Sequence, residues 1–305
     1  MFIGTAGSAP TARRGLPATL VRRGGDRLLF DCGEGTQRQL LRSIGLLDLE
    51  EVFLTHFHAD HFLGLPGMLK TFGLRGRETP LTIYGPPGLR ALVSALRPLF
   101  GGTAYDVELV ELEPNVPLER DGYVIAPYLV DHRTSAYGYL LAEDDRPGRF
   151  DEARARVLGV QPGPDFGRLQ RGEAVDAGGR EVRPEEVLGE SRRGRRIVLT
   201  GDTAPAEATR VMAHGADLLV HEATFTAEEE ARAAETGHST ARAAAELAAA
   251  AEVVLLALTH VSPRYSPDEL RAEARGVFER TIVPRDFDRV EIPFPERGAP
   301  VHVRA

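Results

Sequence analysis

Four side chains that can bind a metal ion lie within the short segment THFHADH, residues 55–61. Imidazole rings bind zinc-like ions well, and a carboxylate adds a hard anionic oxygen. Burial of these groups without partners would be costly, so a purely structural role explains the cluster poorly. The spacing predicts that His56 and His58 face one ion and that Asp60 and His61 face a second.

Three further candidate ligands follow strand-like segments elsewhere in the chain. His132 comes after the apolar run 126–130, Asp202 after RIVLTG and His260 after VVLLALT. Ligands from distant parts of a sequence commonly meet at the carboxyl ends of sheet strands. Seven ligands suit two ions: His56, His58 and His132 for the first, Asp60, His61 and His260 for the second, and Asp202 as a bridge. Two divalent cations outweigh two carboxylates and a hydroxide, so the site would attract an anionic phosphodiester and supply a nucleophile near neutral pH.

The elements that must position these ligands alternate between strands and helices, as in a layered α/β protein. Apolar runs predict strands at 27–32, 52–55, 81–85, 107–112, 122–129, 136–141, 196–202, 217–223 and 253–260. Helical patterns occupy 36–44, 88–100 and 240–250. We therefore expect a single α/β domain over residues 1–305.

Composition narrows the class of protein. The 305 residues include 45 acidic and 37 basic ones, for a net charge of −8, which argues against a surface that attracts polyanions everywhere. A lone cysteine excludes a disulfide framework and a cysteine-built zinc site. The N-terminus lacks the pattern of a signal peptide, and charges interrupt the most apolar run, 241–258, so no membrane span is expected. We expect a soluble cytoplasmic protein.

Residues 144–194 differ from the rest of the chain. They show little strand or helix periodicity, and Arg146–Arg196 carries a net charge of +3 against −11 for the remainder. One explanation for this difference is an ordinary surface loop that binds nothing. Structureless loops longer than about 12–15 residues are uncommon unless they are functional or disordered, so an inserted flexible arm that binds a partner is the alternative.

The segment THFHADH resembles the His-x-His-x-Asp-His signature of the metallo-β-lactamase superfamily, and other motifs resemble the ribonuclease Z family within it. These motifs are FDCGEGTQRQL at 30–40, THFHADHFLGLPG at 55–67, GPDFGRLQRG at 163–172, GDT at 201–203, HEATF at 221–225, GHST at 237–240 and LTHVSPRY at 258–265. The resemblance implies a four-layer αβ/βα sandwich, two Zn²⁺ ions per subunit and a homodimer. It also implies endonucleolytic removal of the 3′ trailer of precursor tRNA, leaving a 3′-hydroxyl on the tRNA.

The resemblance also implies roles for individual residues. The seven ligands proposed above coincide with those of the family, and Asp60 matches its general base. His238 matches a residue that helps the leaving oxygen depart, and Glu222 resembles the acidic partner that orients it. Asp31 is expected to support the metal ligands from behind. His221 receives no role and is a candidate core residue.

One segment departs from the family pattern. Many ribonuclease Z enzymes carry Pro-x-Lys-x-Arg-Asn near the N-terminus, in a loop that handles the 3′ end of tRNA. Here the segment is PTARRG, in which Pro10 and Arg14 match while Ala12 and Gly15 replace Lys and Asn. We expect Arg13 and Arg14 to contact RNA, with Arg13 replacing the missing lysine charge. The position of cleavage relative to CCA stays open.

The insert supplies the other expected RNA contacts. Its segment PGPDFGRLQRG resembles the Gly/Pro-rich tip of the arm with which bacterial ribonuclease Z holds tRNA. This resemblance predicts an exposed Phe166, with Arg168 and Arg171 on phosphates. Phosphate contacts position RNA without reading its sequence, as an enzyme with many tRNA substrates requires.

Two alternatives remain at this point. The same metal site could hydrolyse a small phosphodiester, thioester or lactam, which would need no nucleic-acid arm. The histidines could instead form a structural metal site, although such sites are usually closed and four-coordinate. Comparing the cleavage of precursor tRNA with that of a chromogenic diester distinguishes an RNA-cleaving enzyme from the first alternative. The metal content per chain tests the second alternative.

Overall fold

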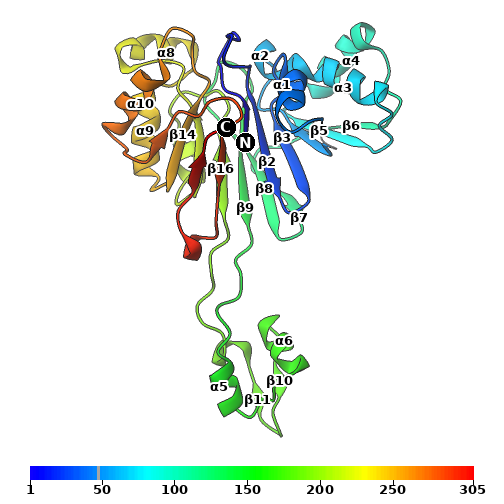
Figure 1. The fold of residues 1–305 in the computed structure, drawn as a ribbon, viewed down its shortest axis with the longest axis vertical. Coiled ribbons are helices and arrows are strands. Elements are labelled where there is room, and N and C mark those ends of the chain that lie inside the picture. Colours follow the sequence, from blue (N-terminus) through cyan, green and yellow to red (C-terminus); the bar gives the residue numbers. More distant parts are fainter. Residues whose placement is uncertain (47–48) are drawn as a thin grey trace.

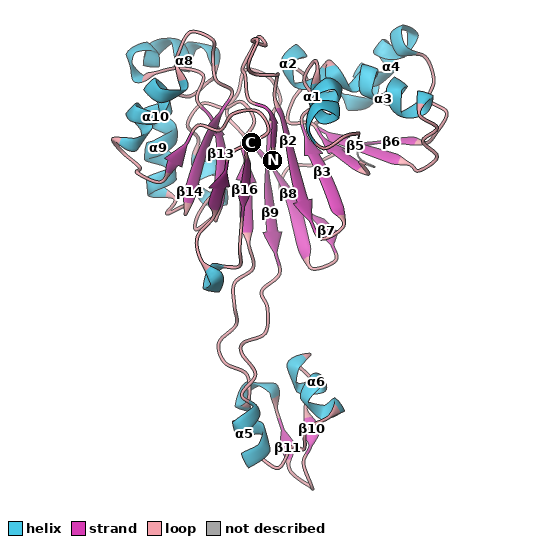
Figure 2. Cartoon of the chain, in the orientation of Figure 1, coloured by secondary structure: helices cyan, strands magenta, loops and turns pink. Residues whose placement is uncertain are grey.

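The computed structural model describes residues 1–46 and 49–305 and contains two large sheets packed face to face (Figures 1 and 2). The first sheet has the strand order β1-β2-β3-β4-β5-β6, in which β3 to β6 run parallel. Its strands are β1 (Phe2–Gly4), β2 (Ala18–Arg23), β3 (Asp26–Phe30), β4 (Glu51–Phe53), β5 (Leu81–Gly85) and β6 (Val107–Glu111).

The second sheet has the order β15-β14-β13-β12-β9-β8-β7, in which β12 to β15 run parallel and β7 to β9 form an antiparallel meander. Its strands are β7 (Leu118–Arg120), β8 (Tyr123–Leu129), β9 (Tyr137–Glu143), β12 (Arg196–Leu199), β13 (Leu218–Glu222), β14 (Leu255–Thr259) and β15 (Thr281–Ile282). A small hairpin, β16 (Arg289–Glu291) with β17 (Val301–Val303), follows, and η3 (Pro295–Arg297) lies between its strands.

Helices cover the outer face of each sheet. On one side lie α1 (Thr36–Ser43), α2 (Ala59–Phe62), α3 (Gly64–Leu74) and α4 (Leu89–Phe100); on the other lie α7 (Glu207–Met212), α8 (Glu230–Thr236) after η2 (Ala227–Glu229), α9 (Ala241–Ala250) and α10 (Pro267–Arg275) (Figure 1). One apolar cluster fills each helix–sheet interface and a third lies between the sheets. These layers confirm the four-layer αβ/βα sandwich that the sequence predicted.

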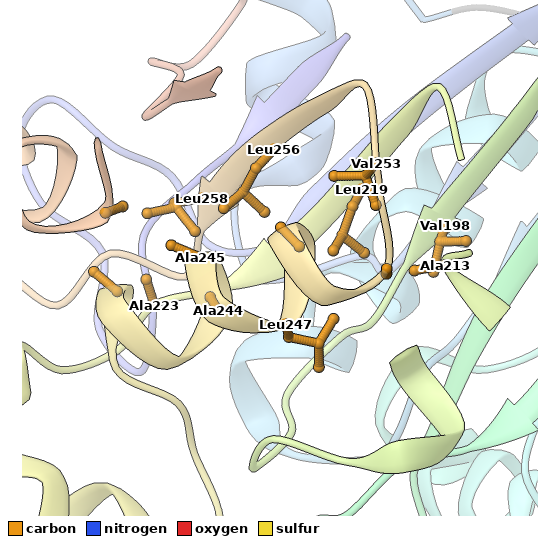
Figure 3. Packing of buried hydrophobic residues seen from close by; sticks show 14 of the residues in the cluster. Val198, Ala213, Leu219, Ala223, Ala244, Ala245, Leu247, Val253, Leu256 and Leu258 are labelled. Atoms are coloured by element: carbon orange, nitrogen blue, oxygen red, sulfur yellow. The ribbon is translucent and has the colours of Figure 1, made fainter. Parts of the chain in front are cut away.

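The packing of α9 shows how the sequence builds one of these interfaces. Thr240 caps the helix by accepting a hydrogen bond from the amide of Ala243. Ala244, Ala245 and Ala248 of α9 are buried against the apolar side chains of β13 and β14, and the close view shows this packing (Figure 3). Small side chains let the helix lie close to the sheet, which fixes the ends of both strands. Those two strands deliver Glu222 and His260 to the site.

The strand and helix positions predicted from periodicity agree with the structure to within a few residues, except in the insert. Residues 144–194 are not irregular: they form α5 (Glu152–Val157), α6 (Pro164–Gln170), the hairpin β10 (Val175–Asp176)–β11 (Glu181–Val182) and η1 (Pro184–Glu186). This unit lies away from the body at the end of two extended connections (Figure 1). It has its own core, made of Ala155, Leu158, Val160, Leu169, Val175, Val182 and Val187. The elements are too short to show a clear period in the sequence.

Two expectations for the insert need correction. Phe166 is half-buried rather than exposed, because it packs on the core of the unit with its ring 4.9 Å from that of Phe150. The positive charge also lies elsewhere than expected. Residues 150–189 carry six arginines against eight acidic residues, so the excess of arginine lies in the connecting segments. There Arg146, Arg193 and Arg195 pair with carboxylates of the body.

In the part of the chain that the structure describes, we find no helix with the length and apolar character needed to cross a membrane.

Candidate metal centre

The site lies where the strands of both sheets end on the same side of the sandwich. Asp31 follows β3, the segment 55–61 follows β4, and His132 follows β8. Asp202 follows β12, Glu222 ends β13 and His260 follows β14. The amide of Tyr137 donates to the carbonyl of Thr55, so a backbone hydrogen bond joins the two sheets beside the ligands. Strand ends therefore gather residues that are up to about 230 positions apart, as the general rule for α/β sheets predicts.

The first group of candidate ligands contains His56, His58, His132 and Asp202, whose ligand atoms all lie within 4.8 Å of one another. Nε2 of His56 lies 2.9 Å from Nδ1 of His58, and that atom lies 3.3 Å from Nε2 of His132. Three imidazole nitrogens that converge on one point with a carboxylate are a normal donor set for zinc. The structure thus brings together the ligands predicted for the first ion.

The second group contains Asp60, His61, Asp202 and His260, again within 4.8 Å. Nε2 of His260 lies 3.3 Å from both Oδ2 of Asp60 and Oδ2 of Asp202. Nε2 of His61 and Oδ1 of Asp202 are buried and lie only 3.2 Å apart. A ring nitrogen and a carboxylate oxygen that converge in the interior are donors that one cation can bind. Asp202 belongs to both groups, as expected of a bridging ligand.

Neighbouring groups hold the ligand rings in place. Oδ2 of Asp31 lies 2.7 Å from Nδ1 of His61, and Oδ1 accepts a hydrogen bond from the amide of Thr55. The Thr55 hydroxyl also lies 3.0 Å from Nδ1 of His56. Contacts of this kind fix which ring nitrogen faces the metal. Asp31 therefore lies where the sequence analysis expected it, behind the ligands.

Two more contacts orient the remaining rings. Nδ1 of His132 lies 2.7 Å from the carbonyl of Gly237, and Nδ1 of His260 lies 2.7 Å from the hydroxyl of Thr224. In both rings this leaves Nε2 directed at the other ligands. Sequence reasoning missed Thr55, Thr224 and Gly237 as supporting residues. Their position beside the ligand motifs was the available signal, but threonines and glycines are too common in loops to be selected on that ground.

The carboxylates dominate the electrostatics of the second group. Burial opposes a charge on the His61 ring, but the nearby Asp202 and Asp31 outweigh burial and raise the pKa of His61 well above its usual value. Burial likewise opposes a charge on Asp202, yet His260, His61 and His56 hold the pKa of that carboxyl well below its usual range. The site therefore keeps Asp202 anionic in the protein interior, ready for a cation.

His238 and Glu222 form a pair beside the two ligand groups. Nδ1 of His238 lies 2.7 Å from Oε1 of Glu222, which is 1% exposed. Glu222 also accepts hydrogen bonds from the amides of Thr203 and Thr224. Burial opposes the charge on His238, but the hydrogen bond and charge of Glu222 raise its pKa to about 9. The raised pKa favours the protonated form of His238 at neutral pH, and Glu222 is a buried carboxylate rather than a surface one.

Glycines allow the segments around the site to approach closely. A Cβ on Gly33 would lie 2.2 Å from the carbonyl of Asp60, and a Cβ on Gly64 would lie 2.0 Å from the carbonyl of Gly33. Real Cβ atoms do not tolerate such contacts. The glycines of FDCGEG and HFLGLPG therefore let the loop after β3 pack directly on α2, at the end of the metal motif, and on the start of α3.

The N-terminal loop contains one expectation that needs correction. Arg14 is buried, and its Nη1 donates to the Thr5 hydroxyl and to the carbonyl of Pro284. Its guanidinium therefore supports the loop from inside, which contradicts the exposed position expected of an RNA contact. Arg13 is exposed, as an RNA contact requires.

His221 is fully buried, in agreement with its expected place in the core.

Comparison with known proteins identifies the class to which this fold and site belong. Residues 14–260 match the model of the metallo-beta-lactamase superfamily. The chain belongs to that superfamily, as the THFHADH motif indicated.

Within the superfamily, the chain belongs to the ribonuclease Z family. It is 46% identical over 297 residues to ribonuclease Z of Methanosarcina acetivorans, covering 96% of this chain and 97% of the relative. It is 48% identical over 307 residues to ribonuclease Z of Gemmatimonas aurantiaca, covering 98% and 97%. Among solved structures, the short form of human tRNase Z matches with a TM-score of 0.69 and 26% identity, over 96% of this chain and 98% of the other. The family resemblance read from the sequence motifs is confirmed.

Proposed function

We propose that this protein is the zinc-dependent endoribonuclease that removes the 3′ trailer of precursor tRNA and leaves a 3′-hydroxyl on the tRNA. Membership of the ribonuclease Z family makes it a hydrolytic endoribonuclease. The observation that carries the proposal is the pair of ligand groups that share Asp202, with a protonated His238 beside them. An anionic substrate with a poor leaving group needs this combination.

We propose two zinc ions per subunit. His56, His58 and His132 would hold the first, Asp60, His61 and His260 the second, and Asp202 would bridge them. Zinc bound there would act as a Lewis acid and lower the pKa of a coordinated water. The imidazole-rich donor set favours zinc over Mg²⁺ or Ca²⁺, which prefer oxygen ligands. The buried Nε2 of His61 and Oδ1 of Asp202, which converge to 3.2 Å, support the occupancy of the second position.

Asp60 is the proposed general base. Its side chain is largely buried, and Oδ2 accepts a hydrogen bond from the amide of Ser8 while lying 3.3 Å from Nε2 of His260. This arrangement holds one carboxylate oxygen in place, so that the group can take the proton of the attacking water at a fixed position.

His238 is the proposed general acid, and Glu222 its positioning partner. Departure of a ribose oxygen is slow unless a proton or charge stabilises it as the bond breaks. Nδ1 of His238 is engaged by Glu222, which leaves Nε2 to donate to the leaving oxygen. The raised pKa keeps that proton in place at neutral pH.

We also propose that residues 144–194 bind the body of the tRNA. The unit stands clear of the body on two extended connections, at the end of the sheets opposite the metal centre, so its surface is accessible to a large partner (Figure 1). Arg168 and Arg171 are exposed and share Glu173 as an ion-pair partner. Exposed ion pairs contribute little to stability in water, so phosphates can compete for both guanidinium groups. Arg13 is the proposed contact near the 3′ end.

A homodimer and a cytoplasmic location complete the proposal. Exposed leucines on the side of the molecule that carries α1 to α4 support a subunit interface there: Leu41, Leu63, Leu74 and Leu99. Light scattering after size exclusion measures the mass of the assembly, and a mass near 66 kDa, twice the 33.2 kDa of the chain, is expected.

The decisive experiment incubates the purified, metal-loaded protein with precursor tRNAs that carry or lack an encoded CCA and maps the new 3′ ends. We expect a single cleavage that leaves a 3′-hydroxyl on the tRNA, and the two substrates define the position relative to CCA. Hydrolysis of a chromogenic diester without cleavage of precursor tRNA would favour a small-molecule hydrolase instead. One tightly held ion and no hydrolysis would favour a structural metal site.

A further inference from the structure

We propose that Asp286 is a positioning residue. By holding both ends of the loop 5–15, it keeps the side chains of Asp60 and His260 in place. Asp286 lies near the C-terminus, far in sequence from every candidate ligand, and it does not belong to any of the motifs described above. The inference rests on the proposed function, because it assigns Asp60 and His260 to the second ion.

The carboxylate of Asp286 joins the two ends of this loop. The Thr5 hydroxyl donates to Oδ1 at 2.7 Å, and the amide of Gly15 donates to Oδ2 at 2.6 Å. Both contacts are shielded from water, since Thr5 is fully buried and Asp286 is 8% exposed. The amide of Ala6 also donates to the carbonyl of Gly15, so the base of the loop is closed by one backbone hydrogen bond and by this carboxylate. Hydrogen bonds to an ionised group are stronger than neutral ones, so Asp286 adds the stronger contacts.

Neighbouring side chains keep that carboxylate in place. Nε2 of Gln39 donates to Oδ2 of Asp286 at 2.5 Å, from helix α1. Arg14 donates to the Thr5 hydroxyl and to the carbonyl of Pro284, which ties the loop to the same C-terminal segment. The PTARRG departure from the family pattern therefore lies on a loop whose base is fixed from inside the protein.

The far part of the loop reaches both ligands of the second ion. Ser8, whose φ is 60°, donates its amide proton to Oδ2 of Asp60 at 2.9 Å. Gly7 lies against the ring of His260 so closely that a Cβ there would be 2.4 Å from Nδ1. The amide of Gly7 also donates to the carbonyl of Val261, directly after His260.

The loop therefore acts as a clamp between Asp286 and the second ion. If its base opened, the Ser8 amide would move away from Asp60, and the contact that restrains the His260 ring would loosen. Residues that orient ligands typically contribute 10–100-fold in metal affinity or activity. The contacts of this loop given above involve Asp60 and His260 and none of the residues proposed to hold the first ion, which are His56, His58 and His132. We therefore expect the effect to be confined to the second ion.

The test compares Asp286→Asn with Asp288→Asn. Asp288 is a matched control, because it is also buried in the C-terminal segment and accepts backbone hydrogen bonds, from Arg285 and Ala305. We expect Asp286→Asn to weaken binding of the second zinc by about tenfold in a chelator competition while the first is retained. On precursor tRNA, kcat should fall with little change in KM, and excess zinc should restore it. Asp288→Asn should change none of these quantities beyond a general loss of thermal stability.

A second pair keeps the inference testable if Asp286→Asn does not fold. Thr5→Val removes the hydroxyl with little change in shape, whereas Thr5→Ser retains it. Weaker binding of the second zinc by Thr5→Val, with near-normal binding by Thr5→Ser, supports the inference. Equal zinc binding and kcat in Asp286→Asn and Asp288→Asn, or equal loss of both ions, would overturn it. Failure of the wild-type protein to cleave precursor tRNA would instead overturn the proposed function, which the zinc competition does not depend on.

Discussion

Glu222 lies 2.7 Å from Nδ1 of His238 and is almost completely buried. Its carboxylate also accepts hydrogen bonds from the amides of Thr203 and Thr224, so it has no freedom to turn away. A buried anion that accepts a hydrogen bond from Nδ1 makes His238 a stronger base and leaves Nε2 to carry the transferable proton.

This relationship predicts the alkaline limb of the pH profile. The pKa of His238 is raised to about 9, so the required acid form is present at neutral pH and is lost as the pH rises through about 9. Glu222→Gln removes the anion, and the alkaline limb of kcat should move toward the ordinary histidine value of about 6.5. The measurement is kcat against pH for both proteins. An unchanged limb in the variant would assign it to another group.

His238→Ala should retain both metal ions and lower the chemical step, because His238 is not needed as a ligand. The expected loss on precursor tRNA is about 10²–10⁴-fold in kcat. The defect should shrink with a p-nitrophenyl diester, whose leaving group needs little protonation. Equal losses on both substrates, or a loss of zinc, would contradict the assignment of His238 as general acid.

Asp60→Ala should lower turnover by at least about 10²-fold, because it removes the proposed base and a ligand of the second ion. Binding of precursor tRNA should largely survive, since the proposed RNA contacts lie elsewhere. Single-turnover cleavage and a filter-binding titration at saturating zinc separate the two effects. Near-normal cleavage by the variant would rule out the proposed role.

Removal of the metal should abolish cleavage and lower the thermal stability without unfolding the protein. The sandwich has three apolar clusters of its own, whereas the site gathers buried carboxylates and imidazoles such as Asp202 and His61, which lie 3.2 Å apart. A ligand that binds only the folded state adds about 2.7 kcal/mol at 100 times its Kd. Thermal melts at graded free zinc after chelation measure this gain. Full activity in the thoroughly chelated protein would exclude a catalytic metal.

Replacement of residues 150–187 by a short Gly/Ser linker should weaken binding of precursor tRNA by orders of magnitude. The two ends are adjacent, since the amide of Asp151 donates to the carbonyl of Val187, and the removed unit has its own core. Zinc content and small-diester hydrolysis should not change. If the shortened protein processes precursor tRNA with the wild-type KM, the insert does not bind RNA.

Pairs of arginines can be tested with the insert left in place. Arg168→Ala with Arg171→Ala should reduce the salt dependence of binding by about one phosphate contact each. Arg180→Ala with Arg183→Ala is a matched control, because these arginines are also exposed and paired with carboxylates of the insert. Equal effects of the two pairs would show that the contact is not specific to α6.

Periodicity and local motifs determined most of the architecture. The alternation of strands and helices was enough for a layered α/β protein, because each element has an apolar face with a clear period. The segment 55–61 was sufficient by itself to indicate a metal site, because four ligand-type side chains in one turn have few other uses. His132, Asp202 and His260 could be predicted as further ligands because each follows a predicted strand, and parallel strands end at one edge of a sheet.

Only the tertiary structure decided which of these side chains are free to act. No local pattern indicates that Arg14 points inward or that Phe166 packs on the small core of the insert, because burial depends on contacts between segments far apart in the chain. The partners Thr55, Thr224 and Gly237 and the loop tether at Asp286 were invisible for the same reason. A hydrogen bond between residues 5 and 286 leaves no local pattern, since it exists only once the sandwich has brought the two segments together.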